Sequence, residues 1–191
     1  LVALLDEAGV NDLRTFSIGF EDQPEEKGNE FEFSDQIVER YKTKHHKYLI
    51  SNSEVLPRLP EAVENMSEPM VGQDAVAFYL LSEVVSKDVK VVQSGQGADE
   101  VFGGYFWYPQ MHHSIKPGLQ RFAAHYFDRT HKEYLETVSS EFHGEDYTSR
   151  LMAELIRDAD ADEYIDRVLA VDVTTLVVDD PVKRVDNMTM A

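Results

Sequence analysis

Cysteine is absent from this 191-residue chain, and the absence removes several kinds of chemistry. A chain without thiols has no disulfide framework, no thiolate metal site and no cysteine nucleophile. A long apolar run is lacking too, since no stretch approaches the about 20 apolar residues that a membrane-spanning helix needs. The first residues lack the basic-then-apolar order of a signal peptide. We therefore expect a cytoplasmic protein with no membrane partner.

Basic residues are scarce. The chain carries 18 Lys and Arg against 36 Asp and Glu, which gives a formal net charge of −18 at pH 7. A surface of this charge repels polyanions, so we expect no nucleic-acid partner. The acidic excess fits a solvated surface, and it also fits adaptation to a salty cytoplasm or to acidic partners. With 42% hydrophobic residues, the composition is that of one soluble globular domain.

Short runs of β-branched and aromatic residues predict strands in the first part of the chain. These runs cover residues 14–20, 46–50 and 89–92. Helical patterns lie around them, at residues 1–8, 31–44, 53–66 and 74–87. Strands that alternate with helices are typical of an α/β fold, in which helices flank a parallel sheet.

After residue 105 the sequence is helical, with no convincing strand. Helical segments are predicted at residues 120–126, 133–138, 147–159 and 163–171. We therefore divide the chain into an α/β core at residues 1–110 and a helical half at residues 111–191, both parts of one domain. The aromatic run from Tyr105 to Tyr108 is interpreted as core packing, with a ligand wall as the alternative.

One glycine-rich segment carries the chemistry, Val91-Val-Gln-Ser-Gly-Gln-Gly-Ala-Asp-Glu-Val-Phe-Gly-Gly-Tyr105. A strand is expected to end here at a Ser-Gly-x-Gly turn that starts a helix. Glycines let a phosphate approach the backbone, and N–H groups at a helix start point toward its charge. A Walker A loop is excluded because Gly-Lys-Ser/Thr is missing, and Glu100 and Val92 replace the glycines of a dinucleotide fingerprint and a nucleophile elbow. The alternative is a structural turn capped by Asp99.

Asp99 and Glu100 occupy the first turn of the expected helix. Acidic residues there suit the helix dipole and need no further role. Two carboxylates beside a phosphate-binding turn also suit Mg²⁺, which prefers one or two carboxylates together with substrate phosphates. We favour Asp99 as the magnesium ligand, acting with pyrophosphate, and keep Glu100 as a second candidate.

Three segments in the same order resemble the asparagine synthetase family. Ser94-Gly-Gln-Gly-Ala-Asp-Glu-Val-Phe-Gly-Gly-Tyr105 is similar to the family signature Ser-Gly-Glu-Gly-Ser/Ala-Asp-Glu-x-Phe-Gly-Gly-Tyr. Thr15-Phe-Ser-Ile-Gly-Phe20 looks like its second strand. Asp179-Asp-Pro-Val-Lys-Arg-Val-Asp-Asn-Met-Thr-Met-Ala191 looks like its late helical Lys/Arg-x-Asp-x-Met-Ser-Met-Ala segment. The resemblance therefore extends along most of the chain.

The resemblance implies a synthetase domain of the PP-loop ATP pyrophosphatase type, with an adenine nucleotide alpha hydrolase-like fold. Such a domain uses ATP and Mg²⁺ to adenylate a carboxylate, and ammonia then displaces AMP. By resemblance, adenine lies against the backbone of Ile18, and the signature turn contacts the nucleotide through Ser94, Gly95 and Gly97. Asp99 then helps to hold Mg²⁺ and pyrophosphate.

Two catalytic candidates follow from the same resemblance. Arg184 takes the family's basic position, although it and Lys183 also fit ordinary surface positions. Gln96 stands where the signature has glutamate. Glutamine cannot act as a general base, but its amide can orient ammonia or a substrate amide by hydrogen bonds. Glu68-Pro69 resembles a segment near the family's active-site mouth, and a structural turn is its simpler interpretation.

The substrate has two interpretations. Aspartate is the family's usual carboxylate, whereas Gln96 and the Tyr-Phe-Trp-Tyr-Pro109 run resemble amidotransferases that make N-acetylglutaminylglutamine amide. The family's first phosphate loop, Ser-Gly-Gly-x-Asp-Ser, and its glutaminase domain are not among these residues. We expect the first strand and loop to precede Leu1, ammonia to come from a glutaminase domain of the parent chain, and this piece alone to be inactive. A homodimer stays open, and a non-catalytic nucleotide-binding module is the rival hypothesis.

Overall fold

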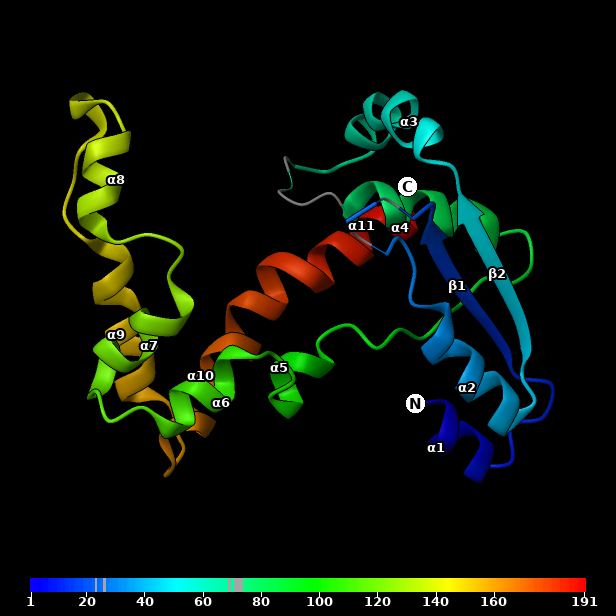
Figure 1. Cartoon of the computed structure of the whole chain (residues 1–191), viewed down its shortest axis with the longest axis horizontal. Coiled ribbons are helices and arrows are strands. Elements are labelled where there is room, and N and C mark those ends of the chain that lie inside the picture. The colour runs from blue at the N-terminus through cyan, green and yellow to red at the C-terminus, as the bar shows by residue number, and fades with distance from the viewer. Residues whose placement is uncertain (23, 26, 69, 71–73) are drawn as a thin grey trace. The chain divides into compact units, whose positions relative to one another are not determined.

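The computed structural model describes residues 1–22, 24–25, 27–68, 70 and 74–191. Within them the chain forms two compact units (Figure 1). The first comprises Leu1–Gly95 and Lys183–Ala191, and the second comprises Gln96–Val182. The division of the chain at residue 110 into an α/β core and a helical half was based on sequence patterns, and it stays a prediction.

A parallel pair of strands organises the first unit. β1 (Arg14–Phe20) pairs with β2 (Lys44–Ile50) along its whole length. Parallel neighbours need a crossover connection, and α2 (Phe31–Tyr41) supplies it. The strand predicted at residues 14–20 is confirmed. The second strand begins before the predicted residue 46, because α2 ends at Tyr41 and Lys42 turns the chain with a φ of 52°.

Among the described residues, four more helices complete the first unit and confirm its α/β class. α4 (Asp74–Val85) contacts β1, and both α3 (Asn52–Glu64) and α11 (Lys183–Met190) pack against α4. The short α1 (Val2–Glu7) packs against α2. One buried cluster of this unit contains Ile50, Ala62, Val76 and Leu80. Burying a side chain such as Ile, Val or Leu contributes about 1.5–3 kcal/mol to folding.

The strand predicted at residues 89–92 is wrong. Residues 91–95 have no regular structure, and the sheet formed by the described residues contains β1 and β2 alone. Val91 is 84% exposed. Because an extended segment becomes a strand only when its backbone pairs with a neighbour, β-branched composition alone does not form a strand here.

The second unit is helical, as predicted. Its helices confirm the patterns near residues 120, 133, 147 and 163, whereas α6 was not predicted because aromatic residues dominate its first turn. A 3₁₀ turn follows α8, and a π-helical turn precedes α11. The helices are α5 (Ala98–Phe102), α6 (Trp107–His113), α7 (Gly118–Tyr126), α8 (His131–Thr137), α9 (Tyr147–Asp158) and α10 (Tyr164–Thr174).

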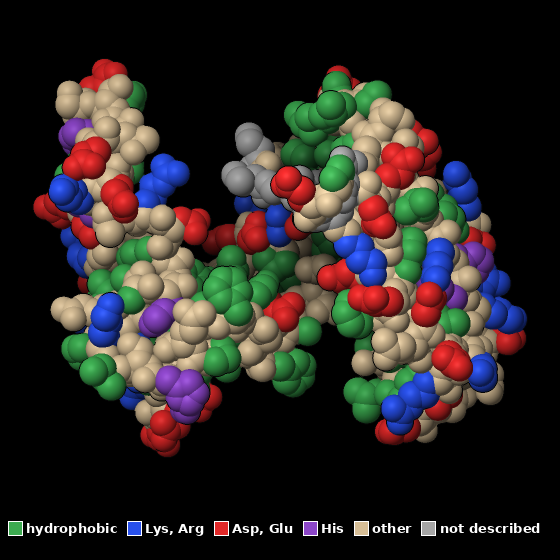
Figure 2. All heavy atoms as spheres, viewed as in Figure 1, with side chains coloured by type: hydrophobic (Ala, Val, Ile, Leu, Met, Phe, Trp, Pro, Cys, Tyr) green, Lys and Arg blue, Asp and Glu red, His purple; other side chains and the backbone are tan. Residues whose placement is uncertain are grey.

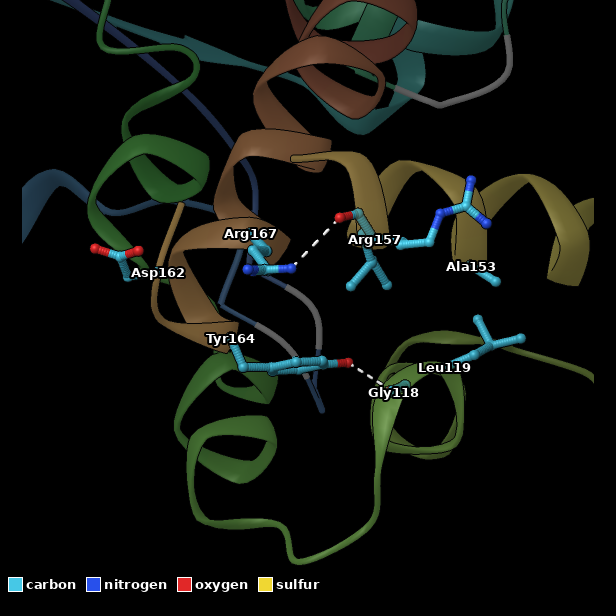
Figure 3. A pocket seen from close by; sticks show the side chains of 8 residues that line it. Gly118, Leu119, Ala153, Arg157, Asp162, Tyr164 and Arg167 are labelled. Carbon is cyan, nitrogen blue, oxygen red and sulfur yellow. Dashed lines mark hydrogen bonds between the residues drawn. The ribbon is translucent and has the colours of Figure 1, made fainter. Parts of the chain in front are cut away.

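Arginines satisfy the ends of helices in this unit. Arg121 donates to the backbone oxygens of Met111 and His112 at the end of α6. Arg167 donates to the oxygen of Ala161 at 2.8 Å, after the end of α9. Arg167 and Tyr164 also line a cavity of about 550 Å³ (Figure 3). The Arg167 and Tyr164 side chains both donate hydrogen bonds to backbone carbonyl groups. We therefore interpret this cavity as a space between packed helices and not as a ligand site.

A buried carboxylate ties three of these helices together. Asp172 of α10 is 1% exposed. It accepts hydrogen bonds from Tyr108 of α6 at 2.6 Å and from Tyr126 of α7 at 2.9 Å. Hydrogen bonds to a charged group contribute about 1.5–3 kcal/mol each. Burial raises the pKa of Asp172 and outweighs the two tyrosine hydrogen bonds, which lower it.

Acidic side chains are scattered over the visible face of both units, with basic side chains between them (Figure 2). This distribution fits a solvated acidic surface. Among the described residues, no helix is long and apolar enough to cross a membrane.

Asp172 should make the stability of the chain depend on pH. Its folded-state pKa lies above its ordinary value of 3.8, so the folded state binds more protons than the unfolded state between the two pKa values. The stability from this group is therefore complete at low pH and is lost as the pH rises through the folded-state pKa. Urea unfolding should show the original chain gaining stability relative to Asp172→Asn as the pH falls from about 7 toward about 4. The opposite trend would mean that the tyrosine hydrogen bonds outweigh burial.

Candidate functional site

The predicted phosphate-binding turn lies where the two units meet in the sequence. Ser94 and Gly95 end the first unit, and Gln96 begins the second; all three residues are exposed. Gly97 directly precedes α5 with a φ of +88°, a backbone conformation that favours glycine. The expected turn into a helix is therefore present.

The two acidic residues of α5 face different surroundings. Asp99 is exposed, whereas Glu100 is 1% exposed and accepts a hydrogen bond from the Tyr105 hydroxyl at 2.8 Å. Burial, and then this hydrogen bond, raises the pKa of Tyr105 well above its usual range, so the hydroxyl stays a donor. Asp99 is thus the carboxylate of the pair that a ligand can reach.

The second glycine of the Gly-Gly-Tyr sequence, Gly104, lies directly against Asp99. Its N–H donates to the backbone oxygen of Asp99 at 2.8 Å. A Cβ at position 104 would overlap the Oδ1 of Asp99. A side chain there would consequently displace the Asp99 carboxylate, so the sequence Gly-Gly-Tyr keeps Asp99 in place while Tyr105 binds Glu100.

A cavity of about 860 Å³ lies beside β1 in the first unit. β1 and residues 89–95 line it, together with apolar side chains of α1, α2 and α4. Ser94 and Gly95 are among its lining residues. Ile18 contributes elsewhere, since its side chain packs against the core. The nucleotide contact expected at the backbone of Ile18 stays a prediction.

Arg184 lies at the start of α11, in the first unit. Its Nη1 is 3.6 Å from the Oδ2 of Asp74, the first residue of α4. The neighbouring Lys183 places its Nζ 2.8 Å from Glu68 Oε1. Sequence patterns did not identify Asp74 as a partner because it lies far from Arg184 in the chain. Of the predicted Glu68-Pro69 pair, Pro69 lies outside the described residues.

Among the described residues, no three histidine, aspartate or glutamate side chains form a group that could hold a metal ion. Mg²⁺ is commonly bound by one or two carboxylates with substrate phosphates, so a single reachable carboxylate suits that mode. The metal roles of Asp99 and Glu100 stay predictions.

Comparison with known proteins identifies the family. A family model described as asparagine synthase matches residues 1–191. The chain belongs to the asparagine synthase family. Glutamine-hydrolyzing asparagine synthetase 1 of Bacillus subtilis is 32% identical over 119 residues, which are 59% of this chain and 18% of that protein.

Relatives from other microorganisms give the same result. A putative glutamine-hydrolyzing asparagine synthetase of Methanocaldococcus jannaschii is 38% identical over 93 residues, 49% of this chain and 17% of that protein. One from Mycobacterium bovis is 36% identical over 96 residues, 50% of this chain and 14% of that protein. The matches span less than a fifth of each of these asparagine synthetases.

The two glycines of the signature turn should respond differently to alanine. Gly97→Ala should lower the free energy of unfolding by about 1–2 kcal/mol, because an L-residue is strained at its positive φ. Gly95→Ala is the matched control: a Cβ there meets nothing within 4 Å among the described atoms. Its unfolding free energy should stay within about 0.5 kcal/mol. Denaturant unfolding of both variants makes the test, and equal losses would contradict it.

Proposed function

We propose that this asparagine synthase family chain is the ATP-binding part of an amide-forming ligase, which adenylates a carboxylate that ammonia then attacks. The observation that carries this proposal is the signature itself: an exposed turn leads into α5, where Asp99 is exposed and Glu100 is buried. Its exposure lets the Asp99 carboxylate reach a metal ion and phosphates, while the Tyr105 hydrogen bond keeps Glu100 inside.

ATP and Mg²⁺ fit the residues present. Ser94 offers a hydroxyl donor, and Gly95 and Gly97 let phosphate oxygens approach the backbone. Asp99 would hold Mg²⁺ together with pyrophosphate, and Glu100 is the second choice because Tyr105 already binds it. When bound, Mg²⁺ would offset the negative charge that develops on the leaving pyrophosphate.

Two further residues receive proposed roles. Arg184 would bind a phosphate of the nucleotide, since its guanidinium offers several donors in a fixed plane. Gln96 would orient ammonia or the acceptor carboxylate by hydrogen bonds, because its amide cannot take up a proton. Ammonia would be supplied by a glutaminase domain of the parent chain, as the names of the relatives suggest.

A further strand could occupy the cavity beside β1. In the described part of the chain, β1 pairs with β2 alone, and residues 89–95 pair with no strand. A strand inserted between them would satisfy both backbones and cover the apolar lining. We assign this place to the strand that carries the family's first phosphate loop. Residues 1–191 alone should then form no amide.

Asp99→Asn should separate catalysis from folding in the full-length protein. Asparagine keeps the shape beside Gly104, and a lost helix-dipole interaction costs only about 0.3–1 kcal/mol of stability. Loss of the charge that holds Mg²⁺ should reduce ATP–pyrophosphate exchange by about 100-fold or more, since each ~1.4 kcal/mol is tenfold in rate. Exchange and thermal unfolding are measured in parallel. If exchange stays within a few-fold of the original protein, Asp99 only caps the helix.

Gln96→Glu should shift substrate preference toward aspartate if residue 96 separates the two substrate classes. The specific observation for the alternative, N-acetylglutaminylglutamine, is the glutamine itself in an exposed position of the signature. Competition between aspartate and this blocked dipeptide in the full-length protein measures the preference. An unchanged ratio would place substrate choice elsewhere. A full-length protein that binds ATP but shows no exchange with either substrate would favour the non-catalytic module.

A further inference from the structure

Three side chains of α11 contact Ser67 and Glu68, which follow α3, and Asp74, the first residue of α4. The Oδ1 of Asn187 accepts a hydrogen bond from the backbone N–H of Ser67 at 3.1 Å and another from the Ser67 hydroxyl. The Lys183–Glu68 and Arg184–Asp74 ion pairs lie on the same helix. Met188 is fully buried and anchors α11 in the first unit. The backbone of α11 is thus fixed independently of Asp74.

The Arg184–Asp74 pair is unequal in exposure. The Arg184 side chain is 12% exposed, whereas the Asp74 side chain is 57% exposed. Arginine carries about 2 kcal/mol of side-chain rotamer entropy, which both burial and charged neighbours reduce. The Asp74 carboxylate, 3.6 Å from Nη1, is one such neighbour of Arg184.

We propose that Asp74 is a positioning residue, which holds the Arg184 guanidinium in the orientation that binds a phosphate of the nucleotide. The inference rests on the proposed function of Arg184. Asp74 lies in the first turn of α4, where a carboxylate is favoured by the helix dipole. It therefore acts on Arg184 from a rigid element that packs directly against α11.

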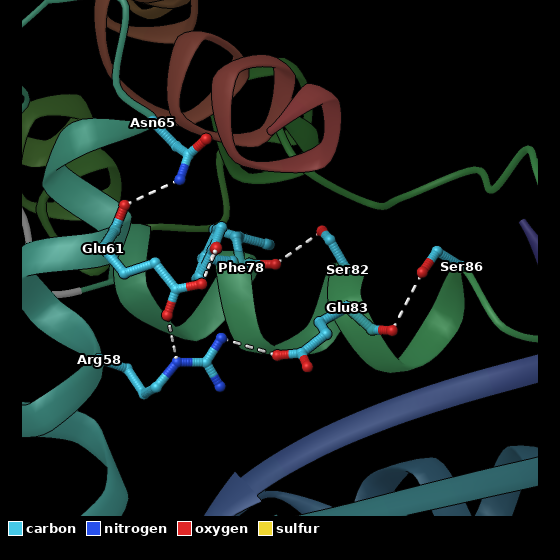
Figure 4. A network of polar contacts seen from close by, with 8 residues as sticks. Arg58, Glu61, Asn65, Phe78, Ser82, Glu83 and Ser86 are labelled. Carbon is cyan, nitrogen blue, oxygen red and sulfur yellow. Dashed lines mark hydrogen bonds and ion pairs between the residues drawn. The ribbon is translucent and has the colours of Figure 1, made fainter.

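The helix α4 also offers a matched control. Glu83 of α4 pairs with Arg58 of α3 at 2.8 Å, and Arg58 also binds Glu61 at 2.7 Å (Figure 4). Glu83→Gln thus removes one ion pair from the same helix, as Asp74→Asn does. The carboxylate that is changed is exposed in both pairs, so both losses should have small effects on stability, about 0–1 kcal/mol.

The test compares Asp74→Asn, Asp74→Glu and Glu83→Gln in the full-length protein. In ATP–pyrophosphate exchange, Asp74→Asn should raise KM for ATP about tenfold and leave kcat within about threefold, a loss equivalent to ~1.4 kcal/mol of binding. Asp74→Glu should restore most of the affinity, and Glu83→Gln should stay within about twofold. A KM for Asp74→Asn equal to that of Glu83→Gln overturns the proposal.

A second measurement does not depend on activity. Phenylglyoxal modification of Arg184, followed by peptide mass spectrometry, should be faster in Asp74→Asn than in the original protein or in Glu83→Gln. An unchanged rate overturns the positioning role by itself. If the original protein shows no exchange at all, the proposed ligase function fails, and the modification rate alone then decides whether Asp74 holds Arg184.

Discussion

The hydrogen bond between Tyr105 and the buried Glu100 is the constraint on which the candidate site depends. It holds one acidic residue of α5 inside the second unit, and the adjacent Asp99 is consequently outside, packed against Gly104. Burial is the main cause that raises the pKa of Asp172, and the nearby Glu100 carboxylate adds to the rise. A short helix that would be marginal by itself is thereby fixed by its buried side chains.

The first unit uses a different device to hold its candidate residue. α11 packs against α4 and so brings residues 183–191 into the first unit. An ion pair at its start places Arg184 beside Asp74. The buried Met188 side chain anchors α11 in the first unit. The ion pairs of Lys183 and Arg184 orient these side chains and add little to the stability of the fold. In both units a buried contact therefore fixes a helix that carries a charged candidate residue.

Local patterns predicted most elements, because they report on the backbone and on one buried face. β1 was predicted with its observed bounds, and helices α7 to α10 of the second unit followed from their periodicity. The strand at residues 89–92 failed because pairing depends on a neighbour that a local pattern does not contain. At the site, sequence indicated the turn and Asp99, but the burial of Glu100 and the pairing of Arg184 with Asp74 arise from tertiary contacts.

Adenylation of a carboxylate is tested most directly by following its oxygen atoms. The full-length protein is given ATP, Mg²⁺, ammonia and a substrate whose carboxylate carries heavy oxygen, with aspartate and N-acetylglutaminylglutamine in parallel. Mass spectrometry then examines the AMP that is released. If the carboxylate attacks the α-phosphate, one heavy oxygen atom appears in AMP for each amide formed. Heavy oxygen in inorganic phosphate together with ADP, or amide formation with unlabelled AMP, would contradict adenylation.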